Sequence, residues 1–390
     1  MNILFLSRWY PYPTNNGSKL RVYNLLRGLS QHHAVTLLSF SDQPPAESDA
    51  EQVRALCADV HVVPWREFDP YSSRARLGFL SLKPRSIIDT FSSEMADNIT
   101  TLLGGKNFDL VIASQLPMAA YYPYFGDTPA VFEEMEIGLS LEASRQSTDW
   151  KKRLRNSITW LKLRLYLMGL LKAYRAVTVV SEQEQKLVRE NFGGLREVLV
   201  LPNCMNLEDY QDLQVDPRPD TLIFTGSFRY HTNHEAMQWF VGQVFPLVLE
   251  QRPSTQLIIT GDHAGLPLPS LRNVTLAGYV DDIKSLIASS TVALAPLWSG
   301  GGTRLKILEA MAIGTPVVAT SKGAEGLEAA SGEHLFIADD PARFAERVVE
   351  LLANASLRQS LAQQARQLVQ EKYTWAGTLP RLLRLLDSLS

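Results

Sequence analysis

Short apolar segments alternate with helix-length amphipathic segments along this chain, and this alternation is the feature that most constrains its fold. A first set of strand-like runs comprises Ile3–Leu6, Val35–Ser39, Val60–Val63, Leu110–Ala113, Ala130–Phe132 and Val177–Val180. A second set comprises Leu222–Thr225, Gln256–Thr260, Val274–Leu276, Val292–Ala295, Val317–Ala319 and His334–Phe336. Strands that alternate with helices form parallel sheets covered by those helices. The sequence therefore predicts an α/β protein with two doubly wound units in tandem.

A polar, proline-bearing stretch separates the two sets. It includes Leu201–Asn203 and Gln214–Asp220, and its composition predicts a linker between two domains. We expect an N-terminal domain over residues 1–205, a C-terminal domain over residues 206–374, and a final helix over residues 375–390 that packs back on the N-terminal domain. Ligands of such folds bind at the carboxyl ends of the strands, so we expect the site in the crevice between the two domains.

The composition narrows the class of protein. A net charge of -3 argues against a nucleic-acid binder. The two cysteines, Cys57 and Cys204, fit no disulfide framework, and no His, Cys or Asp grouping has the spacing of metal ligands. The chain begins with the strand-like Asn2–Ser7 instead of a signal sequence, and no apolar run is long enough to cross a bilayer. We expect a cytoplasmic protein that holds no metal.

Three consecutive glycines, Gly300–Gly302, join a strand-like run directly to a helical segment. Glycine lets the backbone approach a ligand closely, and the first amides of a helix are unpaired donors with partial positive charge. Arg304 and Lys306 add two positive charges in the first turn, where acidic residues are usual. The pattern predicts a site for an anion such as a diphosphate. A flexible loop beside two solvated cations is the alternative.

Glu309 lies on the apolar stripe of that helix, formed by Leu305, Leu308 and Ala312. A carboxylate on the packed face of a helix costs free energy unless a hydrogen bond satisfies it. The position therefore predicts a partner for Glu309, either a protein donor or a ligand hydroxyl. Sugars and ribose supply such hydroxyls.

Gly17 follows the first strand and opens an amphipathic helix. Its backbone can approach a phosphate or a sugar, or it is a turn glycine next to Ser18 as the N-cap. No G-x-G-x-x-G motif follows the first strand, which weakens a dinucleotide dehydrogenase interpretation.

Four sequence blocks, in this order, resemble the retaining GT-B glycosyltransferases of family four. They are Asn16-Gly17, Leu201-Pro202-Asn203, Phe224-Thr-Gly226-Ser227, and Gly300 to Val318 with its Glu309-Ala-Met-Ala-x-Gly-x-Pro. The resemblance runs nearly end to end and is most specific over residues 300–325. It implies a GT-B fold, with two Rossmann-like domains facing across a cleft. It also implies transfer of a sugar from a nucleotide diphosphate sugar to a hydroxyl of a glycan or lipid-linked acceptor, with retention of anomeric configuration.

The resemblance also implies roles for individual residues. Glu309 matches the glutamate that binds the nucleotide ribose, and Val280 ends the segment whose backbone contacts the base. The loop around the sugar and diphosphate is matched by Gly301, Gly302, Thr303 and Arg304, and the glycine that faces it is matched by Gly17. The family needs neither a metal nor a cofactor, because fixed cations and backbone amides stabilise the diphosphate.

Three positions depart from the family pattern. Gly301 stands where the first of two paired glutamates is usual, and Ser227 stands in place of an arginine, with Arg229 nearby. Met135 falls near the usual histidine, among Glu133, Glu134 and Glu136.

These departures leave several interpretations open. We expect Arg304 and Lys306 to stabilise the departing diphosphate, and we choose Glu136 as the acceptor-side carboxylate. A solvated acidic loop around Glu136 is the alternative. For the whole protein, the departures at Gly301 and Met135 keep two alternatives open, a non-catalytic GT-B scaffold and a nucleotide-sugar epimerase.

Residues 151–175 contain eight basic residues and no acidic one. We expect the stripe Leu154, Ile158, Leu161, Leu165 and Met168 to pack on the sheet, which leaves Trp160, Leu163, Leu167 and Leu170 among the cations. This pattern predicts peripheral docking on an anionic membrane surface at the cytoplasmic face, which suits a lipid-linked acceptor in cell-envelope polysaccharide biosynthesis. A core helix with snorkelling cations, or a protein contact, is the alternative.

Overall fold

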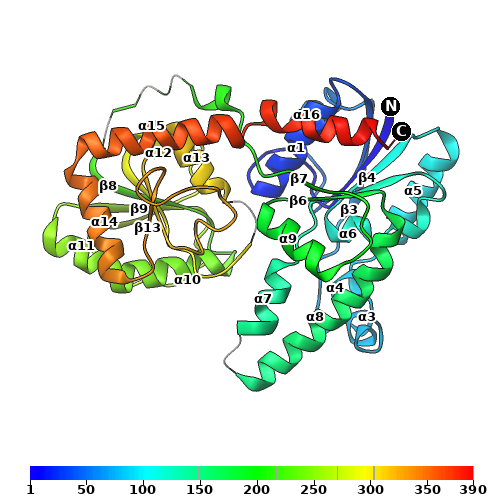
Figure 1. Ribbon diagram of the computed structural model, residues 1–390, viewed down its shortest axis with the longest axis horizontal. Coiled ribbons are helices and arrows are strands. Elements are labelled where there is room, and N and C mark those ends of the chain that lie inside the picture. The colour runs from blue at the N-terminus through cyan, green and yellow to red at the C-terminus, as the bar shows by residue number, and fades with distance from the viewer. Residues whose placement is uncertain are drawn as a thin grey trace. The chain divides into compact units, whose positions relative to one another are not determined.

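The computed structural model describes residues 1–146, 149–211, 213, 215–216, 218–269, 271–301 and 304–389. The chain forms two compact units (Figure 1). Unit 1 comprises Met1–Pro202 together with Leu379–Ser390, and unit 2 comprises Asn203–Thr378. The expected domain ends at residues 205 and 374 thus lie a few residues from the ends of these units.

Unit 1 is built on a parallel sheet whose strand order is β3-β2-β1-β4-β5-β6-β7. The strands are β1 (Asn2–Ser7), β2 (Ala34–Ser41), β3 (Asp59–Pro64), β4 (Leu110–Ser114), β5 (Ala130–Glu133), β6 (Ala176–Val179) and β7 (Val198–Val200). Strand β1 lies between β2 and β4, with Ile3 opposite both Val35 and Leu110. Because β2 and β4 leave β1 on opposite sides, the loops after β1 and β4 diverge, and such a switch point is where ligands of open α/β sheets bind.

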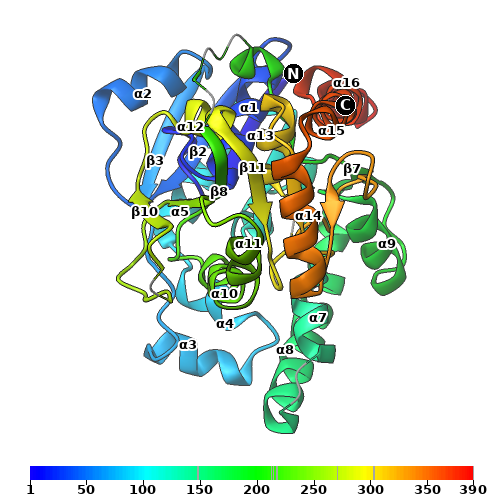
Figure 2. The same ribbon diagram turned by 90° about the vertical axis from the view of Figure 1, so that its left-hand side faces the viewer.

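Helices surround this sheet (Figures 1 and 2). They are α1 (Gly17–Leu29), α2 (Glu47–Arg54), α3 (Ser73–Leu77), η1 (Gly78–Leu80), α4 (Arg85–Asp89), α5 (Ser93–Gly105), α6 (Gln115–Ala119), η2 (Tyr122–Tyr124), α7 (Gly138–Gln146), α8 (Trp150–Leu170), η3 (Leu171–Ala173) and α9 (Glu182–Asn191). The inner strands are covered on both faces, which explains why Ile3–Leu6 and Leu110–Ala113 are uninterrupted apolar runs that are fully buried.

Unit 2 contains a second parallel sheet, of order β10-β9-β8-β11-β12-β13. Its strands are β8 (Arg218–Thr225), β9 (Gln256–Thr260), β10 (Val274–Gly278), β11 (Ser290–Ala295), β12 (Val317–Ala319) and β13 (Phe336–Ile337). Its helices are η4 (Leu207–Tyr210), α10 (His231–Trp239), η5 (Phe240–Val244), α11 (Phe245–Gln251), α12 (Ile283–Ser289), α13 (Leu305–Ile313), α14 (Pro341–Ala353) and α15 (Ala355–Lys372). The switch point of this sheet lies between β8 and β11, so the loops after these two strands open the candidate site.

The last helix, α16 (Trp375–Asp387), begins in unit 2 and ends in unit 1. Its Leu379 packs against Gly28 of α1, where an added Cβ would lie 2.5 Å from Leu379 Cδ2. Glycine at position 28 therefore allows α16 to pack closely on α1.

Helix α8 corrects the predicted orientation of the basic segment. The stripe expected to pack on the sheet is exposed, with Ile158 50% and Leu161 52% accessible. The opposite stripe faces the core, where Leu167 and Leu170 are buried and Trp160 and Leu163 are partly buried. Both stripes are apolar and have helical spacing, so periodicity alone could not show which of them meets the sheet.

Candidate functional site

The glycine loop of unit 2 is held in shape by Arg304, which is the N-cap of α13. The Arg304 side chain is buried; its Nη1 donates to the carbonyl of Gly301 at 2.8 Å, and its Nη2 donates to the carbonyl of Gly300 at 2.7 Å. A third bond, from Nη2 to the carbonyl of Lys322 at 3.3 Å, ties the loop to the turn after β12. The predicted diphosphate cation thus also braces the loop backbone.

A side chain at Gly300 would strain the loop and crowd its neighbours. Its φ is +94°, in the left-handed region, and a Cβ there would lie 2.8 Å from Tyr230 Oη and 3.0 Å from Arg304 Nη1. Gly301 follows it and is half-buried, whereas Gly302 and Thr303, two of the predicted sugar-donor contacts, lie outside the described residues.

Lys306 stands in the first turn of α13 and points into the protein. Its Nζ donates to Asn233 Oδ1 at 2.9 Å and lies 4.1 Å from the centre of the Phe224 ring. Asn233 in turn donates to the carbonyl of Ser227 at 2.8 Å, which links the loop after β8 to α13. Burial, together with the positive charge of Arg304, lowers the pKa of Lys306 to about 7.

Close packing around the ammonium of Lys306 depends on Gly226. This residue has a φ of +148°, and a Cβ there would lie 2.7 Å from Asn233 Nδ2 and 3.1 Å from Lys306 Nζ. The arrangement places the Lys306 ammonium beside the backbone of the Gly226 loop, and an anion that reached it would stabilise its charged form.

Glu309 lies one turn further along α13. It is half-buried beside the packed residues Leu308 and Ala310, and its Oε1 accepts a hydrogen bond from Tyr210 Oη at 3.4 Å. Burial raises the pKa of this carboxyl, while Lys284 lowers it. The structure therefore supplies the protein donor that the sequence required, through a long hydrogen bond that leaves room for further donors.

The structure does not place two other predicted contacts beside Lys306. Arg229 is largely exposed and forms an ion pair with Asp262. Val280 is half-buried and lines a surface pocket with Asp282 and Ser285 at the start of α12. Their contacts with a sugar donor remain predictions.

In unit 1, Gly17 begins α1, but the helix is capped by a different residue from the one expected. Asn16 Oδ1 accepts a hydrogen bond from the backbone N–H of Lys19 at 2.9 Å, so Asn16 is the N-cap. Ser18 is left to accept a hydrogen bond from Gln115 Nε2 at 3.2 Å. Its hydroxyl thus faces the end of β4.

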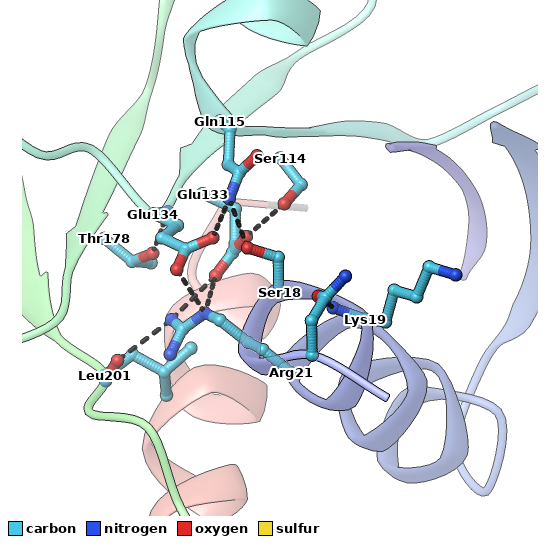
Figure 3. Close-up of polar contacts among 10 residues, drawn as sticks. Ser18, Lys19, Arg21, Ser114, Gln115, Glu133, Glu134, Thr178 and Leu201 are labelled. Carbon is cyan, nitrogen blue, oxygen red and sulfur yellow. Dashed lines mark hydrogen bonds and ion pairs between the residues drawn. The ribbon is translucent and has the colours of Figure 1, made fainter. Parts of the chain in front are cut away.

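A buried ion pair anchors the polar cluster of unit 1 (Figure 3). The Arg21 side chain is 1% exposed; its Nε donates to Glu133 Oε1 at 2.7 Å and its Nη2 donates to the carbonyl of Leu201 at 2.9 Å. Ser114 Oγ donates to the other Glu133 oxygen at 2.6 Å. Both carboxylate oxygens are hydrogen-bonded, which offsets much of the cost of burying the two charges.

Glu134, the next residue, is differently placed (Figure 3). Its Oε2 accepts a hydrogen bond from Gln115 Nε2 at 2.7 Å, while its Oε1 lies 3.9 Å from Arg21 Nε. Its backbone N–H donates to Thr178 Oγ1 at 3.0 Å. Burial raises the pKa of Glu134 to about 7, an effect that Arg21 opposes and Glu133 reinforces.

Two residues of this cluster have strained backbones. Gln115 has a φ of 66° and Glu134 a φ of 58°, in a region that side chains larger than glycine rarely adopt. They follow the neighbouring parallel strands β4 and β5, and their side chains are hydrogen-bonded to each other. Such strain persists where the surroundings enforce it, and it concentrates at functional sites.

This cluster contains Glu133 and Glu134, and the acceptor-side role expected of Glu136 stays a prediction. Glu136 is exposed, and Met135 is buried in the core. Sequence reasoning missed Arg21, Ser114, Gln115 and Thr178. The available signal was that Ser114 and Glu133 end two neighbouring parallel strands and that Thr178 lies one residue before the end of the third, which brings them to one edge of the sheet.

Comparisons with known proteins agree with this architecture. The chain superposes on the structure of Anabaena HepE in complex with UDP and glucose over 100% of both chains, with a TM-score of 0.65 and 14% sequence identity. Two Rossmann-like units with parallel sheets and this likeness define a GT-B fold.

Two family models match the sequence. Glycosyltransferase Family 4 matches residues 15–209, and Glycosyl transferases group 1 matches residues 219–354. The chain therefore belongs to this family of glycosyltransferases, and the protein is a transferase.

Two relatives show how far the similarity extends. An uncharacterized 44.6 kDa protein in the cps region of Klebsiella pneumoniae is 22% identical over 95% of this chain and 96% of its own length. The phosphatidyl-myo-inositol mannosyltransferase of Mycobacterium leprae is 29% identical over 54% of this chain and 58% of its own length.

The buried ion pair of unit 1 makes a testable prediction. Arg21→Leu would leave the Glu133 carboxylate buried without its cation, so we expect the free energy of unfolding of unit 1 to fall by about 3–5 kcal/mol. Urea denaturation followed by circular dichroism measures this change. Arg27→Leu, an exposed cation on the same helix, should change it by less than about 0.5 kcal/mol. Equal effects of the two changes would contradict the anchoring role of Arg21.

Proposed function

We propose that the protein transfers a sugar from a nucleoside diphosphate sugar to a hydroxyl of a glycan or lipid-linked acceptor, with retention of anomeric configuration. The observation that carries this proposal is the half-buried Lys306, whose ammonium lies beside Gly226 and bonds Asn233, in the first turn of the helix that follows the glycine loop. The Anabaena structure with UDP and glucose supports a nucleotide-sugar donor, and the name phosphatidyl-myo-inositol mannosyltransferase of the Mycobacterium leprae relative supports sugar transfer to a lipid-linked acceptor. The cps-region relative supports a role in polysaccharide biosynthesis.

The sugar donor would bind at unit 2. Lys306 would meet the diphosphate, and the backbone amides of the loop at Gly300 and Gly301 would hold the same anion. Arg304 would add its charge while keeping the loop in shape. Glu309 would accept a hydrogen bond from a ribose hydroxyl, since Tyr210 contacts only one of its oxygens and does so at 3.4 Å.

The reaction breaks the bond between the anomeric carbon and the diphosphate oxygen and forms a bond from that carbon to the acceptor oxygen on the same face. The acceptor proton passes to the departing phosphate. Negative charge grows on the diphosphate as the bond breaks, so the cations at Lys306 and Arg304 stabilise the transition state more than the ground state. This charge stabilisation requires neither a metal nor a cofactor in the proposed mechanism.

Unit 1 would bind the acceptor through Glu134. Its carboxylate is oriented by Gln115 and is 14% exposed, so it can still accept a hydrogen bond from a hydroxyl group. Glu133 cannot take this role, because Arg21 and Ser114 occupy its oxygens.

The pKa of Lys306 predicts how sugar-donor binding depends on pH. The ammonium must be charged to attract the diphosphate, and its pKa in the free protein is about 7. We therefore expect affinity for the donor to fall as the pH rises through about 7, by up to about tenfold per pH unit. Titration calorimetry between pH 6 and pH 9, in roughly unit steps, measures the affinity and the uptake of protons on binding.

A charge-retaining variant is the matched control for this prediction. Lys306→Arg carries a guanidinium that does not titrate in this range, so its affinity should not vary with pH. Lys306→Met should bind the donor weakly at every pH. A wild-type affinity that is constant from pH 6 to pH 9, roughly the range over which the ammonium is expected to titrate, would contradict the role of Lys306.

The two carboxylates after β5 make a paired prediction. With saturating sugar donor, Glu134→Gln should lower kcat/KM for the acceptor by about 10- to 100-fold, because a hydrogen bond to a charged carboxylate is replaced by a weaker one to a neutral amide. Glu136→Gln should leave it nearly unchanged. The wild-type rate should also rise with pH through about 7 as Glu134 loses its proton, and this rise should vanish in Glu134→Gln. A larger effect of Glu136→Gln than of Glu134→Gln would assign the acceptor-side role to Glu136 instead.

A further inference from the structure

Helix α8 presents a continuous row of apolar side chains to solvent. Exposed fractions are 69% for Trp150, 55% for Leu154, 50% for Ile158, 52% for Leu161, 43% for Leu165 and 47% for Met168. At about 100° per residue these six side chains lie within an arc of about 80° on the helix. Single exposed apolar residues are ordinary, but a contiguous row marks an interaction surface.

A second segment of unit 1 extends this row. It comprises α3, η1 and the two residues after η1, and its exposed apolar side chains are Leu77 (67% exposed), Phe79 (62%), Leu80 (92%) and Leu82 (54%). Lys162 Nζ in the middle of α8 donates to the carbonyl of Phe79 at 2.6 Å, which fixes the two segments side by side. We call the exposed apolar residues of 77–82 and 150–168 the apolar ridge. Both views show α8 extending away from the sheet of unit 1 (Figures 1 and 2).

Basic residues border the apolar ridge on both sides. By the same helical geometry Lys151, Arg155 and Lys162 lie along one edge of the row on α8, and Arg153 and Arg164 lie along the other. The second segment adds Arg74, Arg76, Lys83 and Arg85. Residues 150–175 and 70–88 contain no acidic residue, and Asp149 is the N-cap of α8, where it accepts a hydrogen bond from the backbone of Lys151. The border of the ridge is therefore strongly cationic.

We propose that the apolar ridge docks unit 1 on an anionic lipid bilayer. Apolar side chains would enter the boundary between headgroups and acyl chains, while the cations on either side would meet lipid phosphates. The protein would lie on the membrane, since no helix in the described ranges is long and apolar enough to cross it. A protein partner fits less well, because charged residues are depleted in the cores of protein interfaces and here they line both edges of a row one helix wide.

Docking differs from sugar transfer and can be tested apart from it. A lipid-linked acceptor would be presented at the surface on which the protein lies, yet sugar-donor binding belongs to unit 2. Variants of the apolar ridge should therefore bind nucleotide sugar like the wild type.

The experiment is flotation of the full chain with vesicles of phosphatidylcholine, with or without phosphatidylglycerol. We expect the wild type to bind only the anionic vesicles. The charge variant is Lys151→Glu with Arg155→Glu, and its control is Arg366→Glu with Arg381→Glu, two exposed cations elsewhere. The apolar variant is Ile158→Gln with Leu161→Gln, and its control is Leu266→Gln with Leu276→Gln, two exposed leucines of unit 2.

Each ridge variant should weaken vesicle binding at least about 30-fold, as expected for the loss of two contacts with the membrane surface, and each control should bind like the wild type. Circular dichroism and nucleotide-sugar binding verify that the variants are folded. Three results would overturn the proposal: no binding of the wild type to anionic vesicles, equal losses in ridge variants and controls, or self-association in sedimentation velocity that the apolar variant abolishes.

Discussion

The candidate site depends on a positive charge, that of Lys306, which the protein partly removes from water. Among the described residues, the contacts of Lys306 are one hydrogen bond to Asn233 and the face of the Phe224 ring. These contacts do not replace full hydration, since its pKa falls to about 7. Glycine at positions 226 and 300 allows the surrounding loops to approach this ammonium and its neighbour Arg304. A diphosphate that binds here gains both the charge and the backbone donors, which the fold has already positioned.

In unit 1 the buried charges are paired with each other, unlike the charge of Lys306 in unit 2. Arg21 and Glu133 satisfy each other in the interior, with help from Ser114 and the carbonyl of Leu201, and the result is an anchor with little capacity left for a ligand. The carboxylate of Glu134 is largely buried, but its charge is not neutralised, because the guanidinium of Arg21 is already bonded to Glu133. The strained backbones of Gln115 and Glu134 are the local cost of presenting this second carboxylate.

The sequence predicted the architecture well, because alternating strands and helices are a local pattern. The first strand was expected over residues 3–6 and spans Asn2–Ser7, whereas β7, only three residues long, was not expected. Glu309 and Lys306 could be predicted as site residues because they break the usual pattern of their own helix. The Arg21–Glu133 pair was missed because its members are 112 residues apart and only the sheet brings them together. The predicted buried face of α8 was wrong because the helix has two apolar stripes. Helical spacing fits both of them, and only the packing against the sheet shows which one is buried.

The most direct test of the account is NMR of the purified protein with uridine, guanosine, adenosine and thymidine diphosphate sugars, which follows ligand binding and the anomeric signal of the released or transferred sugar. The account predicts that one sugar donor binds, that the diphosphate is released slowly, and that the sugar first appears in the configuration it had in the donor. Binding without release of diphosphate, even with a membrane extract as the source of acceptor, would contradict it and favour a scaffold. Conversion of the free donor into an isomer would favour an epimerase.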